Sequence, residues 1–369
     1  MFANCRTPPS SESRSGHNQS APRKILYAFD PAATTPPSDS FSFIRWSNIS
    51  QDADYKHAIP IYPPSLRVPW PTSLPTSLQS RHWQTAERAA QEYTETILPR
   101  NPQQATPQTR IDTMIDTAVS YAANLTPLSN PNRLHLLTKT FLLLFLHDDA
   151  VDTGDHSSTT VIPTAHKPFT TLHPAYDTLS RNLLTEDPIQ GQHLLKEIAS
   201  WASLSQQTHP THKTFNNLDE YLIHGLPDFG ASLILRMVEF SLPAPLTPQD
   251  KQPLQSLESL CAKHLLLTND LYSYPKEAMA EPETVLNAVQ VIQDLMNVST
   301  SSATSILRLL IRDLEAQMDA EYTRLEQVQL PALPQLTYAR AMIVAAAGNM
   351  FFSATCPRYA RVVEGSRLL

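Results

Sequence analysis

The chain has 369 residues, of which 41% are hydrophobic and 17% are charged, so it holds enough apolar material for a substantial core. A formal net charge of −7 without a long basic run makes nucleic acid an unexpected partner. Seven glycines against 32 prolines argue against glycine-rich nucleotide loops, and three widely spaced cysteines (Cys5, Cys261 and Cys356) indicate neither a zinc site nor a disulfide framework.

The N-terminal part predicts a tail followed by an irregular arm. Residues 1–24 are polar and rich in Ser and Pro, which is typical of disorder, and they lack the hydrophobic stretch of a secretory signal. From there to about residue 80, repeated prolines interrupt any helix, although Trp46 and Trp70 indicate an arm that packs against the main body. No apolar run approaches the roughly 18 residues of a membrane span, so we expect a cytoplasmic protein without a transmembrane segment.

Helical periodicity dominates the rest of the chain. Residues 154–176 contain Gly154 and three prolines and are expected to form a long surface loop. No alternation typical of strands persists for more than a few residues, so we predict a single all-α domain over residues 25–369. The expected helices lie near residues 83–98, 110–124, 132–153, 188–207, 216–225, 228–241, 249–275, 283–295, 301–327 and 335–354.

The first acidic motif follows a helix that is apolar almost all round, over residues 136–146. Three aspartates, Asp148, Asp149 and Asp152, come at its C-terminal end, where the helix dipole disfavours negative charge. Because Asp148 and Asp152 are four residues apart, they share one face and could hold a metal ion together. A solvated helix end that leads into an acidic loop is the alternative.

The second motif is a polar stripe on a later helix. Asn269, Ser273 and Glu277 recur every four residues, and their amide, hydroxyl and carboxylate oxygens form a plausible set for one Mg²⁺. Lys276 beside them could reach a phosphate oxygen, and Pro275 removes a backbone N–H and predicts a kink. The alternative is a polar stripe on an amphipathic helix that simply ends at the proline.

The two motifs, in this order, resemble those of class I terpene synthases (terpene cyclases). Residues 273–277, 287–289 and 356–359 are most similar to the cyclase half of fungal bifunctional diterpene and sesterterpene synthases, and the resemblance extends from about residue 83 to Tyr359. It implies an isoprenoid-synthase helical bundle around an apolar cavity and a role in isoprenoid secondary metabolism. Since no second domain follows Tyr359 here, a separate prenyltransferase is expected to supply the substrate.

Three Mg²⁺ ions are implied by the resemblance. Two are expected at the aspartate motif and one at the polar stripe, and the implied ligands are Asp148, Asp152, Asn269, Ser273 and Glu277. All of these except Asp152 are also expected to carry the catalysis.

Diphosphate binding is implied for Arg358 and Tyr359, with Lys276 nearby, although Arg358 taken alone could equally be a surface charge. The family usually places an Arg three residues before an Asp at a break in a central helix. Here Asp228 and the break are present, but Gly225 occupies the position of the Arg. His224, Arg236 or another cation could substitute for it, or diphosphate binding could be weaker.

The pocket is expected to be lined by aromatic side chains, among them Phe229, with Asn349 on the last helix pointing into it. The other candidates, each of which could equally be plain core, are Phe141, Phe145, Phe351 and Phe352.

The activity predicted from these features is ionisation and cyclisation of a linear prenyl diphosphate, with geranylgeranyl or geranylfarnesyl diphosphate favoured. Two alternatives stay open. One is a chain-elongating prenyltransferase, which would usually carry two aspartate-rich motifs, and the other is a non-catalytic helical protein that binds prenyl diphosphates. The sequence is compatible with a monomer or a homodimer.

Overall fold

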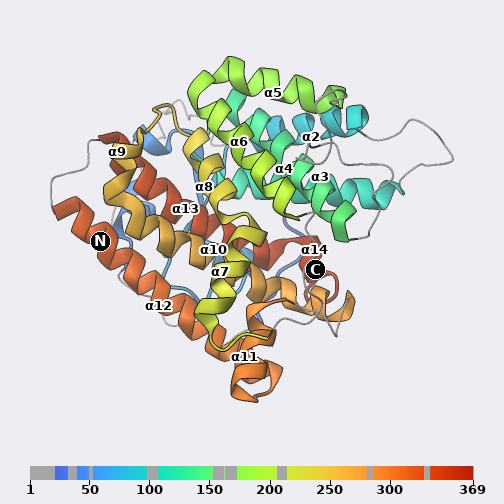
Figure 1. Cartoon of the computed structure of the whole chain (residues 1–369), viewed down its shortest axis with the longest axis vertical. Helices are drawn as coiled ribbons and strands as arrows, with labels where there is room; N and C mark the ends of the chain where they lie inside the picture. Colours follow the sequence, from blue (N-terminus) through green and yellow to red (C-terminus); the bar gives the residue numbers. More distant parts are fainter. Residues whose placement is uncertain are drawn as a thin grey trace, which may run out of the picture.

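The computed structural model describes residues 21–31, 40–49, 53–97, 107–152, 162, 173–205, 214–280, 286–327 and 333–368, with the backbone alone at Trp46 and Asp152. Over these residues the chain is a bundle of helices (Figure 1), as predicted. The helices are α1 (Trp46–Ile49), α2 (Trp83–Ile97), α3 (Gln108–Leu125), α4 (Pro131–Asp152), α5 (Pro174–Glu186), α6 (Pro188–Ser205), α7 (Leu218–Phe229), α8 (Ala231–Phe240), α9 (Pro248–Lys251), α10 (Gln255–Ala280), α11 (Ala288–Met296), α12 (Thr300–Gln327), α13 (Leu333–Thr355) and α14 (Pro357–Ala360).

Helix α13 is the centre of the bundle. Nearly every residue from Tyr338 to Thr355 is buried, because the segment is apolar or small on all faces. It packs against α10 on one side and α3 on another, and α3 in turn packs against α4. Gly348 permits the closest of these approaches, since a Cβ there would lie 1.9 Å from the Asn124 carbonyl oxygen of α3.

The arm before α2 folds over the bundle, as expected from its tryptophans. The Trp70 indole donates to the Leu74 carbonyl at 2.7 Å and meets the ring of Phe351 on α13 edge to face. The arm also contains a feature that was not predicted, a short antiparallel pair of β1 (Ala58–Ile61) with β2 (Ser77–Ser80). Its remaining turns are the 3₁₀ segments η1 (Ser42–Ile44), η2 (Ala53–Tyr55) and η3 (Pro63–Leu66), and a further one, η6 (Gln252–Leu254), precedes α10.

Buried charges attach the arm to the helices. Arg308 of α12 donates to the Asp30 carboxylate at 2.9 Å and to the Tyr272 hydroxyl at 3.0 Å, and Tyr272 in turn donates to Asp30. The Glu315 carboxylate of α12 accepts from the Ser73 backbone N–H at 2.8 Å and from the hydroxyl of the same residue at 2.6 Å.

Of the predicted tail, only residues 21–24 are among those described. Arg23 there is held by two acidic side chains, Glu87 at 3.3 Å and Asp116 at 2.6 Å.

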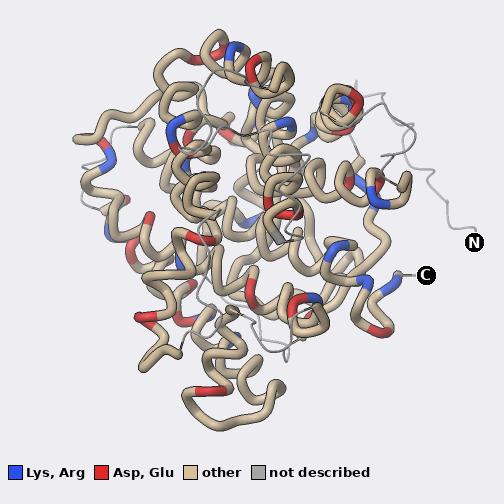
Figure 2. The backbone as a smooth tube through the Cα atoms, turned by 45° about the vertical axis from the view of Figure 1, so that its right-hand side comes forward, with Lys and Arg blue, Asp and Glu red and all other residues tan. Residues whose placement is uncertain are grey.

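Positions of Lys and Arg are interspersed along the backbone with those of Asp and Glu, and no large part of the described fold holds one sign alone (Figure 2). None of the helices in the described ranges combines the length and the apolar character that crossing a bilayer requires.

Candidate active site

The aspartate motif lies on the last turns of α4, beside a partly buried arginine. Arg358 of α14 donates to the Asp149 carboxylate at 2.6 Å and to the Asp148 carboxylate at 3.2 Å. Burial alone would lower the pKa of Arg358, but the two carboxylates outweigh it and raise the pKa, so the guanidinium stays charged. Asp152 closes the helix one turn later, and its side chain lies outside the described residues. Asp149, which was not predicted as a ligand, thus makes the shorter contact with this cation.

The second motif reaches the same short helix through the neighbouring residue. The Asn269 amide nitrogen of α10 donates to the Tyr359 hydroxyl at 2.8 Å. Tyr359 is 6% exposed, and its burial raises the pKa of the phenol, so the hydroxyl remains neutral. Because Nδ2 of Asn269 is committed to this bond, Oδ1 is the atom that remains to bind a cation.

Two consecutive residues of α14 therefore hold the two motifs together. Arg358 contacts the end of α4, and Tyr359 contacts the middle of α10. Neighbouring Cα atoms are about 3.8 Å apart, so the aspartate motif and the polar stripe lie at the same end of the bundle. The sequence predicted that the two motifs lie together only through the resemblance. In the structure, this placement rests on the contact of Asp148 with Arg358 and the contact of Asn269 with Tyr359.

The polar stripe continues along α10 towards its C-terminal end. Ser273 is buried, Glu277 and Lys276 are partly buried, and the helix continues through Pro275 to Ala280 rather than ending at the proline. The Glu277 carboxylate accepts from the Asn287 amide nitrogen at 2.9 Å through Oε2. Within the described part of the chain, Oε1 of Glu277 makes no hydrogen bond.

Asp270 follows the first residue of the stripe, and its side chain is buried in protein next to Glu277. Its Oδ2 accepts from the Tyr221 hydroxyl of α7 at 2.5 Å and from the Ala288 backbone N–H at the start of α11 at 3.0 Å. Burial, with Glu277 close by, raises the pKa of Asp270 well above the ordinary aspartate value. This side chain joins three helices, and its contacts mark it as a structural neighbour of the stripe.

The break in the central helix lies between α7 and α8, at Gly230. That residue has φ of 76°, a left-handed conformation that glycine adopts without strain, and it both ends α7 and begins α8. Phe229 and Asp228 form the last turn of α7, both half-buried, and the Asp228 carbonyl accepts from the Trp201 indole at 3.0 Å. The sequence predicted a break at residues 226–227, between helices ending at 225 and beginning at 228, and the structure has the break at Gly230.

Gly225, which stands where the family usually has its arginine, is buried against other side chains. A Cβ at this position would lie 3.1 Å from both Leu266 Cδ2 and Tyr221 Cζ. The space that an arginine would need is therefore already filled. His224 next to it is exposed and packs near Phe215, and Arg236 pairs with Glu239 at 2.5 Å, on α8.

An aromatic cluster lies beside the aspartate motif. Tyr121 of α3 is its centre, with ring centroids 4.8 Å from Phe141, 5.6 Å from Phe145 and 4.6 Å from Phe352. The Arg358 guanidinium carbon lies 5.9 Å from the Phe145 centroid. The sequence pointed to the phenylalanines but not to Tyr121, since a lone tyrosine within a helix gives no pattern to detect.

Asn349 is fully buried on α13 and faces α10. Its Nδ2 donates to the Leu265 carbonyl at 3.0 Å, whereas its Oδ1 accepts no hydrogen bond from any described residue. Leu265 precedes Asn269 by one helical turn, so Asn349 supports the part of α10 that carries the polar stripe. That it points into the substrate cavity stays a prediction.

The residues present suit a hard divalent cation. Among the described residues, no group of three or more His, Cys, Asp or Glu side chains is arranged for a metal ion. The α10 stripe instead combines one carboxylate with an amide and a hydroxyl, all oxygen donors of the kind Mg²⁺ prefers. The carboxylates of Asp148 and Asp149, held by one guanidinium, show that positive charge is favoured at the facing position.

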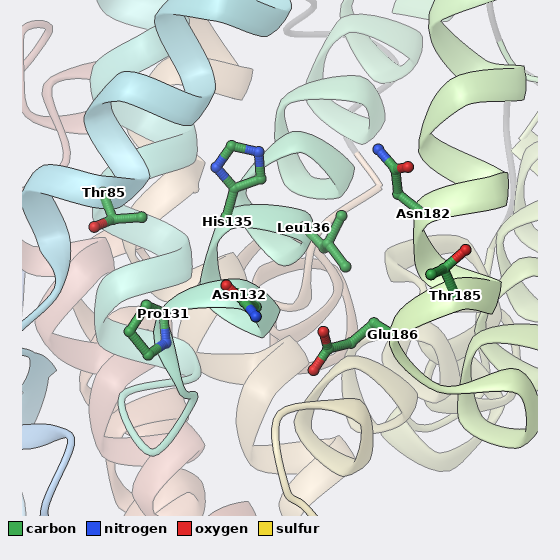
Figure 3. A pocket seen from close by; sticks show the side chains of 8 residues that line it. All are labelled: Thr85, Pro131, Asn132, His135, Leu136, Asn182, Thr185 and Glu186. Atoms are coloured by element: carbon green, nitrogen blue, oxygen red, sulfur yellow. The ribbon is translucent and has the colours of Figure 1, made fainter.

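A cavity of about 370 Å³ lies at the other end of α4 (Figure 3). It is lined by α4, α2 and α5 through Thr85, Pro131, Asn132, His135, Leu136, Asn182, Thr185 and Glu186. None of these residues belongs to either motif. The cavity is thus separate from the candidate active site.

Comparison with known proteins gives concordant matches. The family described as "Terpene synthase family 2, C-terminal metal binding" matches residues 139–317. Terpene cyclase 6 of Gibberella fujikuroi is 34% identical and aligns over 93% of this chain and 96% of its own length. Terpene cyclase aneC of Aspergillus aculeatus is 28% identical and aligns over 92% of this chain and 83% of its own length. The crystal structure of aristolochene synthase from Penicillium roqueforti, 20% identical, superposes with a TM-score of 0.62 over 78% of this chain and 99% of that one.

Proposed function

The chain belongs to the class I terpene synthase family, and on this basis we propose that it uses Mg²⁺ to ionise a linear prenyl diphosphate and cyclises the resulting carbocation. The products are a cyclic terpene and free diphosphate. The observation that carries the proposal is the contact of Arg358 and Tyr359 with both motifs, Asp148 and Asp149 on one side and Asn269 on the other.

We assign the metal-binding roles within the site from the resemblance of the two motifs to those of the family. Asp148 and Asp152 would hold two Mg²⁺ ions, while Asn269, Ser273 and Glu277 would hold the third. Bound Mg²⁺ supplies Lewis-acid stabilisation of the departing diphosphate.

The cationic side chains would bind the diphosphate itself. Arg358 would exchange its carboxylate partners for phosphate oxygens, and Lys276 would add a point charge. With Gly225 in the position of the usual arginine, diphosphate binding would fall to Arg358 and Lys276, together with the Tyr359 hydroxyl.

The aromatic cluster would protect the carbocation. The rings of Tyr121, Phe141 and Phe352 are buried, so they exclude water, and aromatic faces stabilise passing positive charge. Phe229 at the end of α7 would contribute from the helix break.

Substrate length is the finer part of the proposal. The resemblance of residues 273–277 and 287–289 to bifunctional diterpene and sesterterpene synthases favours geranylgeranyl or geranylfarnesyl diphosphate. Such substrates are products of a chain-elongating condensation of isoprenyl units, so a reaction of that class must precede this one.

The test is product analysis by gas chromatography and mass spectrometry after incubation with C15, C20 or C25 diphosphate. We expect a cyclic product from one of the longer substrates when Mg²⁺ is present and none when it is chelated. Asn269→Ala should lower turnover about 100-fold or more, because a cation ligand contributes several kcal/mol to the barrier, with helicity unchanged on circular dichroism.

Three outcomes would contradict the proposal. A longer diphosphate, formed only when isopentenyl diphosphate is added, would identify a chain-elongating transferase. Absence of diphosphate release from every substrate with Mg²⁺ would remove the cyclase assignment. Full activity of the Asn269→Ala variant would remove the third cation site.

A further inference from the structure

Asn287 is a fully buried residue that begins α11 and contacts the polar stripe of α10. Its side-chain oxygen accepts from the Val289 backbone N–H at 2.9 Å, which is the usual bond of a helix N-cap. The cap uses only the oxygen. The amide nitrogen, with two hydrogens to donate, faces α10.

Three acceptors on α10 surround this nitrogen. It lies 2.9 Å from Glu277 Oε2, 3.0 Å from the Asp270 carbonyl oxygen and 3.5 Å from Ser273 Oγ. The first two bonds use both hydrogens, and the third acceptor stands at the limit of hydrogen-bond distance. One amide group therefore touches two of the three side chains of the stripe.

The neighbouring residue strengthens this attachment. The Ala288 backbone N–H donates to the Asp270 carboxylate at 3.0 Å, so the first turn of α11 is joined to α10 by two adjacent residues. Asp270 also receives the Tyr221 hydroxyl of α7. Because all these groups are buried, the amide of Asn287 is held in one orientation. Its hydrogen bond to Oε2 can therefore fix the orientation of the Glu277 carboxylate.

The Asn287 amide is also suited to this place because it carries no charge. An amide N–H is a neutral donor, so it fixes one oxygen of Glu277 without neutralising the carboxylate. A Lys or Arg in the same place would pair with Glu277 and compete with a cation for it. An amide keeps the negative charge of Glu277 available while restricting its rotamers.

We propose that Asn287 is a positioning residue, which orients Glu277, next to Ser273, for cation binding. This inference rests on the proposed function, since it concerns the same stripe. Groups that hydrogen-bond to metal ligands typically contribute 10- to 100-fold to metal affinity or activity.

The test uses substitutions that keep the helix cap and remove the donor. Aspartate and serine are N-caps comparable to asparagine. Asn287→Ser loses the amide nitrogen, and Asn287→Asp replaces it with an oxygen that repels Glu277. The matched control is Asn217→Asp, because Asn217 caps α7 in the same way, through the Glu220 N–H, but is exposed.

The readout is the affinity of the protein for Mn²⁺ in the presence of inorganic diphosphate. It is measured from the electron paramagnetic resonance signal of the free Mn²⁺ ion. We expect both Asn287 variants to bind Mn²⁺ about 10- to 100-fold more weakly, Asn287→Asp the more so. Turnover should be recovered in part at high Mg²⁺ concentration. The control should match the wild type in both measurements.

Wild-type affinity in Asn287→Ser would overturn the inference, and so would a loss of turnover that high Mg²⁺ does not relieve. If Asn287→Asp does not fold, because it adds a charge beside Asp270 and Glu277, the serine variant decides alone. A wild-type protein that neither binds Mn²⁺ nor forms a product would instead refute the proposed function.

Discussion

At the scale of single residues, the sequence points to a candidate site where chemistry dictates residue type and spacing. Asn269, Ser273 and Glu277 recur every four residues, and the helix that carries them is observed. Asp148 was equally detectable, since an acidic group after an apolar helix requires an explanation. Contacts between distant residues could not be predicted, and Asn287 illustrates this. Its donation to Glu277 depends on how α11 packs against α10.

Gly225 also needed the structure, because a glycine in a sequence does not reveal what occupies the space around it. Gly225→Arg should fold less stably, since an arginine must displace Tyr221 and Leu266, which contact the Cβ position at 3.1 Å. Overpacking of this kind costs about 1–3 kcal/mol. Turnover should fall as well, because a displaced Tyr221 no longer donates to Asp270. Urea denaturation and a steady-state assay measure the two effects.

The smaller variant Gly225→Ala is the control for this substitution. A methyl group meets only the ends of side chains that can shift by a few tenths of an ångström, so we expect a minor loss of stability. Higher turnover in Gly225→Arg, with unchanged stability, would show instead that the space opens and that the natural site lacks a diphosphate-binding arginine.

At the scale of secondary structure, periodicity identified the long helices and failed where the pattern was short or interrupted. Helix α5 (Pro174–Glu186) was missed, because its first residues were assigned to a proline-rich loop, although Pro174 stands in the first turn, where proline is favoured. The pair of β1 and β2 was missed for another reason. Four-residue strands, one of them containing Pro60, are too short to show alternation.

Helix packing gives a prediction that opposes helix propensity. Alanine is favoured over glycine inside a helix by about 1 kcal/mol, so propensity alone would have Gly348→Ala stabilise α13. The added Cβ would lie 1.9 Å from a backbone oxygen of α3, which cannot move without the whole helix. We therefore expect a lower thermal midpoint and less soluble protein. Gly365→Ala is the comparison, since nothing lies within 4 Å there and only the strain of its φ of 76° opposes the change. Equal midpoints for the two variants would contradict the packing argument.

At the scale of the whole molecule, the arm and the helices are joined through buried polar groups. Glu315 is one of these joints, fully buried on α12, where Oε1 accepts from the Thr72 hydroxyl and Oε2 from Ser73. Burial would raise the pKa of this carboxyl, but His264, Ser73 and Thr72 together lower it below its ordinary value of 4.5. Composition and periodicity do not predict this contact, because Glu315 lies some 240 residues from Thr72 and Ser73 in the chain.

The lowered pKa gives a pH-dependent prediction. A carboxylate whose pKa is lower in the folded state stabilises the fold above the unfolded pKa and loses that contribution as the pH falls through the folded value. Glu315→Gln should lower the free energy of unfolding by about 1–3 kcal/mol at neutral pH, because buried donors lose a charged acceptor. The difference from the wild type should shrink below pH 4.5.

Urea denaturation at neutral and acidic pH measures this difference, and Glu364→Gln, at an exposed position, is the control. A difference that stays constant with pH would mean that the charge of Glu315 contributes nothing to stability.

The short helix α14 constrains how this part of the chain can change. Arg358 and Tyr359 reach different helices because successive residues in a helix point about 100° apart. An inserted or deleted residue between Cys356 and Tyr359 would rotate one of these side chains away from its partner. The length of this segment is therefore fixed, unlike that of a surface loop, where insertions and deletions are tolerated.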